Sequence, residues 1–195
     1  MPRSTLFTRA RPAGHRTGAR ANGLLFPLDV AYQRAGIALP RARSMSPDKL
    51  PFPYRALLAH ESDMTLTLER HFGGRLCLRT LSTCMDSGWY LRRILLVQEY
   101  SGRPVEMGAL RIKLDPFSPR IRAQILRREA PLGRILRDGG VDFESRPRVF
   151  LAITPNPEMM GVFWMREPRT LYGRRTEVIV EGAKVGDIVE ILPLV

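Results

Sequence analysis

The residue types best suited to chemistry in this sequence are arginines and one glutamate in short strand-like stretches. The arginines are Arg92, Arg93, Arg111, Arg174 and Arg175, and the glutamate is Glu190. An arginine guanidinium binds a carboxylate through charge-assisted hydrogen bonds, often two in parallel. A glutamate buried among apolar residues keeps its proton more easily and can act as a general acid near neutral pH. The set suits a small anionic substrate that needs a proton, although ion pairs on exposed strand faces would give the same pattern.

Arg92 is distinctive because its neighbours in the sequence are mostly apolar. It lies in G-W-Y-L-R-R-I-L-L-V-Q at 88–98, and the turn S-G-R-P separates this run from V-E-M-G-A-L-R-I-K-L-D at 105–115. Such runs around a glycine-containing turn are typical of a β-hairpin. Because strand side chains alternate, Arg92 and Arg93 should point to opposite faces. An unpaired buried charge is costly, so we expect Arg92 to have a partner.

Six strands and several helices are expected to position these residues. Strands are predicted at 75–83, 88–98, 105–115, 148–153, 175–180 and 185–192, and helices at 26–35, 54–60 and 64–72. Asp63 is a suitable N-cap for the last of these helices, and Ser118 with Pro119 opens another. A proline-rich connector is expected at 39–53, and irregular structure at 154–172. Hairpin-linked strands with inserted helices predict an α+β fold, a six-stranded antiparallel sheet packed with helices.

Composition limits the classes of function. The net charge is +12, and residues 1–23 carry five arginines and no acid, so we expect a disordered basic arm there and a single domain at 24–195. Cys77 and Cys84 show no metal-ligand spacing, and the three histidines are scattered, so no metal and no cofactor are expected. No apolar run is long enough to span a membrane and no signal peptide is recognisable, which favours a cytoplasmic protein.

Five short motifs, taken in order, resemble the chorismate pyruvate-lyase family. They are D-M-T at 63–65, Y-L-R at 90–92, P-L-G at 131–133, G-R-R at 173–175 and V-E-I-L-P at 189–193, within a resemblance that covers about residues 50–195. The chain is more similar to uncharacterised lyase-like relatives than to the ubiquinone-pathway enzymes. Glu106 does not belong to the family pattern, and the tail after Glu190 is one residue shorter. The resemblance implies a chorismate lyase-like fold whose flaps enclose the ligand.

The resemblance also implies a function and a site. Family members eliminate pyruvate from chorismate and leave 4-hydroxybenzoate, without a cofactor. Carried over by motif, the substrate-binding residues are Met64, Arg92, Leu132 and Glu190. The arginine would hold a carboxylate, the methionine and leucine would line the pocket, and Glu190 would be the catalytic proton donor near the ether or hydroxyl oxygen.

Two other classes of function stay open. The first is a small-ligand-binding module without catalysis, because the same fold serves as the effector-binding domain of certain bacterial transcription regulators; the sequence predicts no DNA-binding helical domain before it. The second is nucleic-acid binding driven by the basic arm. We do not expect nucleic acid as a partner. The expected partner is a small anionic aromatic-precursor substrate, with no membrane partner, and no pattern indicates an oligomeric state.

Overall fold

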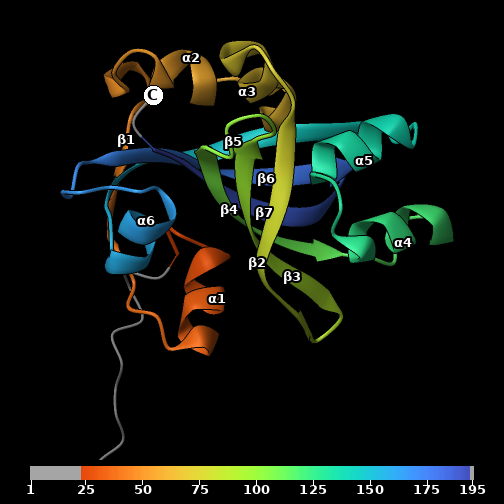
Figure 1. Cartoon of the computed structure of the whole chain (residues 1–195). Helices are drawn as coiled ribbons and strands as arrows, with labels where there is room; N and C mark the ends of the chain where they lie inside the picture. Colours follow the sequence, from red (N-terminus) through yellow and green to blue (C-terminus); the bar gives the residue numbers. More distant parts are fainter. Residues whose placement is uncertain (1–22, 194–195) are drawn as a thin grey trace, which may run out of the picture.

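Seven antiparallel strands form one sheet in the computed structural model, which describes residues 23–193 (Figure 1). The spatial order is β1-β5-β6-β7-β4-β3-β2. The strands are β1 (Arg41–Met45), β2 (Leu76–Asp86), β3 (Trp89–Gln98), β4 (Pro104–Lys113), β5 (Phe143–Thr154), β6 (Leu171–Val180) and β7 (Ala183–Leu192). The α+β class is confirmed. The predicted arm lies outside the described residues apart from Gly23, and the single domain at 24–195 stays a prediction.

The predicted number of six strands was too low by one. The additional strand, β1, lies inside the stretch expected to be a proline-rich connector, and it pairs with β5 at one edge of the sheet. Its sequence R-A-R-S-M has no buried residue and no apolar alternation, because an edge strand can be held by backbone hydrogen bonds alone. The hydrophobic pattern therefore could not reveal it.

Short helices cover both faces of the sheet. They are α1 (Leu28–Ala35), α2 (Tyr54–Leu58), α3 (Met64–Phe72), α4 (Pro119–Arg127), α5 (Leu132–Asp138) and α6 (Pro157–Val162), with a 3₁₀ turn at Pro47–Lys49. The side chains of Asp63 and Ser118 accept hydrogen bonds from the first turns of α3 and α4, so both caps lie where the sequence predicted. Helix α6 falls in the stretch expected to be irregular. No helix in residues 23–193 is long and apolar enough to cross a membrane.

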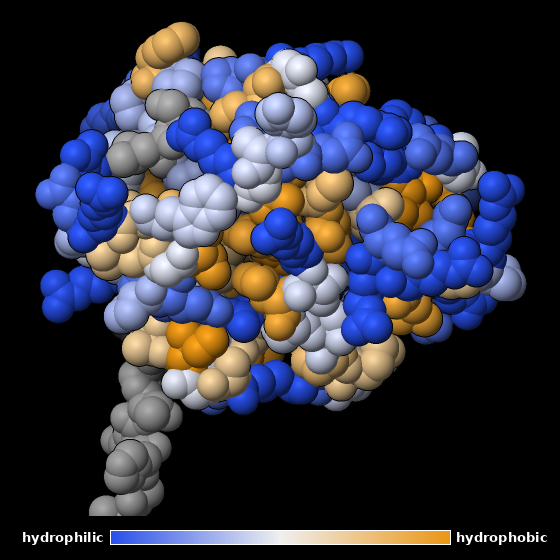
Figure 2. Space-filling view, viewed as in Figure 1, coloured by the Kyte–Doolittle hydropathy of each residue, from blue (hydrophilic) through white to orange (hydrophobic). Residues whose placement is uncertain are grey.

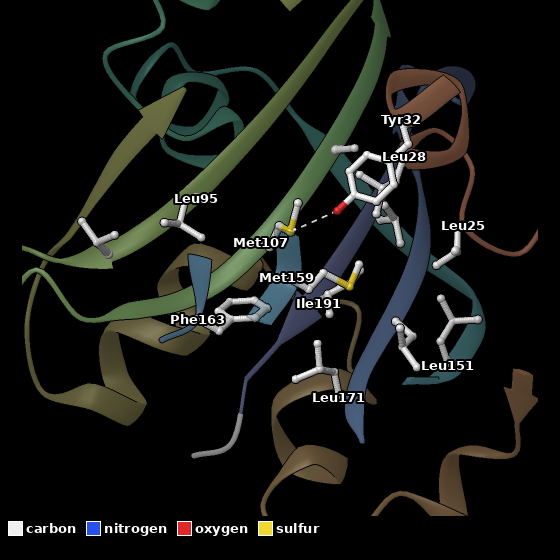
Figure 3. Packing of buried hydrophobic residues seen from close by; sticks show 14 residues of the cluster. Leu25, Leu28, Tyr32, Leu95, Met107, Leu151, Met159, Phe163, Leu171 and Ile191 are labelled. Atoms are coloured by element: carbon white, nitrogen blue, oxygen red, sulfur yellow. Dashed lines mark hydrogen bonds between the residues drawn. The ribbon is translucent and has the colours of Figure 1, made fainter. Parts of the chain in front are cut away.

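One face of the sheet packs against α1 and α6 to form an apolar core (Figure 3). Odd-numbered residues of β3, β4 and β7 point to this face, among them Leu95, Met107 and Ile191. Tyr32 of α1 lies among them, and its hydroxyl donates to the sulfur of Met107 at 3.8 Å. This face is filled and holds the sheet rigid behind the site.

The other face is covered in two parts. Helices α2 and α3 pack over one end in a cluster that includes Leu58 and Leu68, and α4 and α5 pack over the other in a cluster that includes Ile125 and Leu136. Figure 1 shows these helix pairs at separate places around the sheet. The sheet surface between the two clusters is where a cavity lies.

Candidate functional site

A cavity of about 60 Å³ lies on this second face, between the first turns of α3 and α5 and the floor of the sheet. Strands β3, β4, β5, β6 and β7 all contribute to its lining. Its polar lining residues are Asp63, Thr65, Arg92, Glu106, Ser145 and Glu190. In the view of Figure 2, apolar surface gathers near the centre of the molecule and hydrophilic surface surrounds it.

The structure brings together all four residues that the resemblance selects. Met64 is the first residue of α3, Leu132 the first of α5, Arg92 lies in β3 and Glu190 in β7, and each lines the cavity. Strand register explains the convergence of the two charged residues. Gly108 of β4 pairs with Glu190, and its neighbour two positions along, Leu110, pairs with Arg92, so both side chains leave the sheet on the same face. The roles of the four residues stay predictions.

Arg92 is buried without a visible partner. The residue is only 2% exposed, and its Nε and Nη1 atoms find no hydrogen-bond partner among residues 23–193. The hydroxyl of Tyr90, two residues away on the same face, is also unpaired within this range. Burial lowers the pKa of Arg92, the nearby Tyr90 opposes that change, and the positive charge of Arg128 adds to it. A guanidinium stays charged in proteins, so this end of the cavity presents unmatched positive charge.

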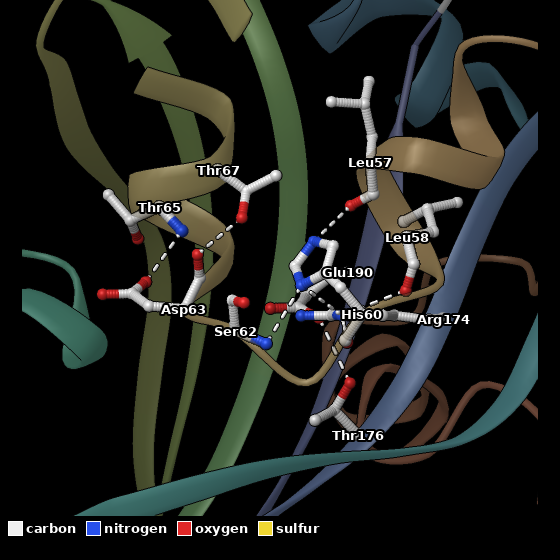
Figure 4. Close-up of polar contacts among 10 residues, drawn as sticks. All are labelled: Leu57, Leu58, His60, Ser62, Asp63, Thr65, Thr67, Arg174, Thr176 and Glu190. Carbon is white, nitrogen blue, oxygen red and sulfur yellow. Dashed lines mark hydrogen bonds and ion pairs between the residues drawn. The ribbon is translucent and has the colours of Figure 1, made fainter. Parts of the chain in front are cut away.

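Glu190, in contrast, is already paired (Figure 4). The fully buried Arg174 donates from Nε to Glu190 Oε2 at 2.5 Å, and the Thr176 hydroxyl donates to the same oxygen at 3.2 Å. Arg174 also donates from Nη1 to the carbonyl oxygens of Leu58 at 3.0 Å and His60 at 2.6 Å. Burial and the charge of Arg174 lower the pKa of His60, which keeps this ring neutral. One oxygen of Glu190 is thus already engaged by Arg174 and Thr176, and its role as proton donor stays a prediction.

Glu106 is a charged group of the cavity that the motif-matched set left out. It lies in β4, it is 4% exposed, and its Oε2 has no hydrogen-bond partner in the described part of the chain. Burial, with the negative charge of Glu190 as the next influence, raises the pKa of Glu106 well above its ordinary value. Glu106 thus shows the raised pKa that the sequence argument expects of a buried glutamate. The alternation of side chains in V-E-M-G-A-L could have located it, because this alternation places Glu106, Gly108 and Leu110 on one face of the strand.

The other predicted arginines do not line the cavity. Arg93 points to the opposite face as expected, where its guanidinium pairs with Glu158 at 2.7 Å and bonds the Ser82 hydroxyl at 3.0 Å. Arg111 stacks on the rings of Phe26 and Trp89, with its guanidinium carbon 5.3 and 4.2 Å from the ring centres. Arg175 bonds the backbone carbonyl oxygen of Gly23. Their pattern in the sequence therefore reflects ordinary structural contacts.

Two carboxylates help to shape the helices around the cavity. Asp63 caps α3 through the backbone N–H of Thr65 at 2.9 Å and forms an ion pair with Arg137 of α5. Gly133 lies against this carboxylate, since a Cβ at that position would be 2.5 Å from Asp63 Oδ1. Glu69 of α3 pairs with Arg134 of α5. The two helices that border the cavity are thus joined by two ion pairs.

Within residues 23–193, no group of three or more histidines, cysteines or acids could hold a metal ion.

Comparison with known proteins gives solved structures only. No protein-family model matches the chain, and no curated protein matches it significantly. One similar structure is PhnF from Mycobacterium smegmatis, with a TM-score of 0.49 and 13% identity over 67% of this chain and 63% of that one. Another is the ligand-binding domain of a provisionally assigned GntR-family transcriptional regulator from Bordetella bronchiseptica, with a TM-score of 0.45 and 15% identity over 60% and 85%.

A third is the C-terminal domain of the histidine utilization repressor from Pseudomonas syringae, with a TM-score of 0.39 and 16% identity over 61% of this chain and 92% of that one. Likenesses at these levels concern the fold alone and say nothing of ligand or activity.

Proposed function

We propose that the protein binds a small carboxylate-bearing ligand in the cavity between α3 and α5, as a binding module without catalysis. The observation that carries the proposal is the buried guanidinium of Arg92, with two nitrogens unpaired among the described residues. Buried charges in folded proteins are paired almost without exception. A ligand carboxylate would supply the missing partner, and each charge-assisted hydrogen bond would contribute about 1.5–3 kcal/mol.

The size of the cavity indicates what must move when such a ligand enters. Its volume of about 60 Å³ is enough for a few water molecules. Typical ligand pockets measure roughly 300–1,000 Å³. The side chains of Met64 and Leu132, at the starts of α3 and α5, are the flexible apolar groups at the border. An aromatic acid would enter if these two side chains change rotamer, which needs no change in the sheet.

Calorimetric titration with benzoate tests this proposal. Arg92→Lys keeps the positive charge but loses the planar fork, so the affinity for benzoate should fall at least about tenfold. Arg93→Lys is the matched control, because Arg93 is the adjacent buried arginine on the opposite face, where it pairs with Glu158. It should leave benzoate binding unchanged. No measurable binding of benzoate, 4-hydroxybenzoate or other small carboxylates to the wild type would refute the proposal.

A second candidate is elimination of pyruvate from chorismate to give 4-hydroxybenzoate. It is favoured by the four motif-matched residues, Met64, Arg92, Leu132 and Glu190, which all line one cavity. It is less well supported because the expected proton donor, Glu190, is already engaged in an ion pair with Arg174. Incubation of the purified protein with chorismate, followed by assays of pyruvate and 4-hydroxybenzoate, separates the two functions. A lyase in which Glu190→Gln is as active as the wild type, with a normal pH profile, would have its proton donor elsewhere.

A further inference from the structure

Glu106 occupies a defined position in the cavity, opposite the end that holds Arg92. On β4 it is two residues from Gly108, and a Cβ at Gly108 would lie 3.1 Å from Glu106 Oε1. The carboxyl group therefore leans over the glycine, toward the middle of the cavity. A larger residue at position 108 would occupy the space that this carboxyl now uses. The glycine thus gives Glu106 access to the ligand space.

We propose that Glu106, and not Glu190, is the second recognition point of the cavity, and that its carboxyl group hydrogen-bonds a hydroxyl group at the ligand end opposite the carboxylate. This inference rests on the proposed function, because it assumes a ligand carboxylate at Arg92. It assigns a specificity role to a residue outside the motifs that resemble the lyase family.

The register of the sheet gives the required shape of the ligand. Glu106 pairs with Leu96, which is four residues along β3 from Arg92. At about 3.4 Å per residue, the two positions are roughly 14 Å apart along the strands. Both side chains are long and line the same cavity, so their polar ends are closer than this. Ile94 and Gly108 form the pair between them. The site therefore suits a flat apolar body with a carboxylate at one end and a hydroxyl at the other.

The charges around Glu106 explain why it suits a hydroxyl. The ionisable groups that act on it are Glu190 of β7, Arg174 of β6 and Asp63 before α3. Arg174 is occupied by Glu190, so the acidic neighbours favour the protonated form of Glu106. A protonated carboxyl both donates and accepts a hydrogen bond, and a ligand hydroxyl matches both. Glu190 is less available, because its Oε2 already accepts two hydrogen bonds.

The experiment compares benzoate, 4-hydroxybenzoate and 4-methylbenzoate by calorimetric titration with the full chain. The wild type should prefer 4-hydroxybenzoate to 4-methylbenzoate about tenfold, the value of one buried hydrogen bond. Glu106→Leu should abolish this preference and leave the affinity for benzoate within about twofold. Glu106→Gln should keep most of it, since an amide also donates and accepts. Arg92→Lys should lower the affinity for all three ligands by a similar factor. The two variants thus distinguish the role of Arg92 from that of Glu106.

A spectroscopic readout on the wild type makes the test independent of how well Glu106→Leu folds. The infrared C=O stretching band of a protonated carboxyl should be present near neutral pH, absent in Glu106→Gln, and shifted by 4-hydroxybenzoate but not by benzoate. Binding of benzoate without any preference for the hydroxyl compound, or without a shift of this band, overturns the role of Glu106 and leaves the proposed function standing. Absence of binding of all three compounds overturns both.

Discussion

Two buried arginines on one face of the sheet should respond differently to the same substitution. Arg92 is 2% exposed and Arg174 is 0% exposed, and they differ in their partners. Within residues 23–193, Arg174 pairs with Glu190 and bonds two backbone carbonyl oxygens, with only its Nη2 lacking a partner, whereas Arg92 has both Nε and Nη1 unpaired. We expect Arg92→Met to raise or preserve the free energy of unfolding of the ligand-free protein, and Arg174→Met to lower it strongly.

The magnitudes follow from the two environments. Replacing a whole buried ion pair by apolar side chains of similar volume is often neutral or stabilises a fold by about 1–4 kcal/mol, and a buried charge without a partner has no attraction to lose in such a replacement. Removing one partner of a buried ion pair costs about 3–5 kcal/mol, because the other charge, here Glu190, remains buried without compensation. In a domain of this size, 1 kcal/mol shifts the melting temperature by about 2–4 °C. The two variants should therefore melt on the order of 10 °C or more apart.

Urea denaturation followed by tryptophan fluorescence measures these differences, with Trp89 and Trp164 as reporters. The slope of the free energy against urea should be the same for both variants, so that the midpoints report stability. Saturating benzoate should stabilise the wild type but not Arg92→Met, because only the wild type binds the ligand tightly. A loss of stability in Arg92→Met as large as that in Arg174→Met would show that Arg92 is paired within the folded protein, and the argument for a ligand would fail.

Three further substitutions test the surroundings of the cavity. The raised pKa of Glu106 means that the folded protein holds this proton where the unfolded chain has lost it. The free energy of unfolding should then fall by up to about 1.4 kcal/mol per pH unit as pH rises from about 4.3 to the folded pKa. In urea titrations, Glu106→Gln should remove this pH dependence. Near pH 4 the free energy of unfolding of this variant should equal that of the wild type. Asp63→Ala should cost about 1 kcal/mol in the same assay through loss of the α3 cap. Gly108→Ala, whose Cβ would lie 3.1 Å from Glu106 Oε1, should reduce the preference for 4-hydroxybenzoate over 4-methylbenzoate in calorimetry and change the free energy of unfolding by less than about 1 kcal/mol.

Local signals made much of the fold predictable. Helix α3 begins and ends as expected because Asp63 caps one end and Gly73, at φ 68°, terminates the other. The central hairpin followed from two apolar runs around a glycine turn. Strand β1 was missed because its stability comes from pairing with β5, more than 100 residues away, as in the pair Arg41 and Thr154. Helix α6 was missed although Asn156 and Pro157 are a helix-start signal, since its Met-rich sequence has no clear periodicity.

The candidate site was predictable in its membership but not in its electrostatics. Ordered motifs selected four residues, and all four line the cavity. The state of Glu190 depends on Arg174, which lies opposite it on β6. Their pairing requires the register of two strands, and a shift by one residue would turn each side chain to the other face. Sequence alone does not fix that register. The expectation for Glu190 therefore considered only its apolar neighbours in the strand and not Arg174 on the adjacent strand. The same register leaves Glu106 without a countercharge of its own.

The charge balance of the cavity distinguishes the two candidate functions. Among residues 23–193, Glu190 pairs with Arg174 and Asp63 with Arg137, and burial raises the pKa of Glu106, so Arg92 is the cation of the cavity without an ion-pair partner. A monoanion such as 4-hydroxybenzoate would balance this charge. Chorismate carries two carboxylates, so its second negative charge would lie in a space that already contains Glu190 and Glu106, at a cost for every unpaired buried charge. Under the proposed function, the cavity would therefore suit a monoanionic acid better than a dianion such as chorismate. This match is the physical reason to prefer ligand binding over pyruvate elimination.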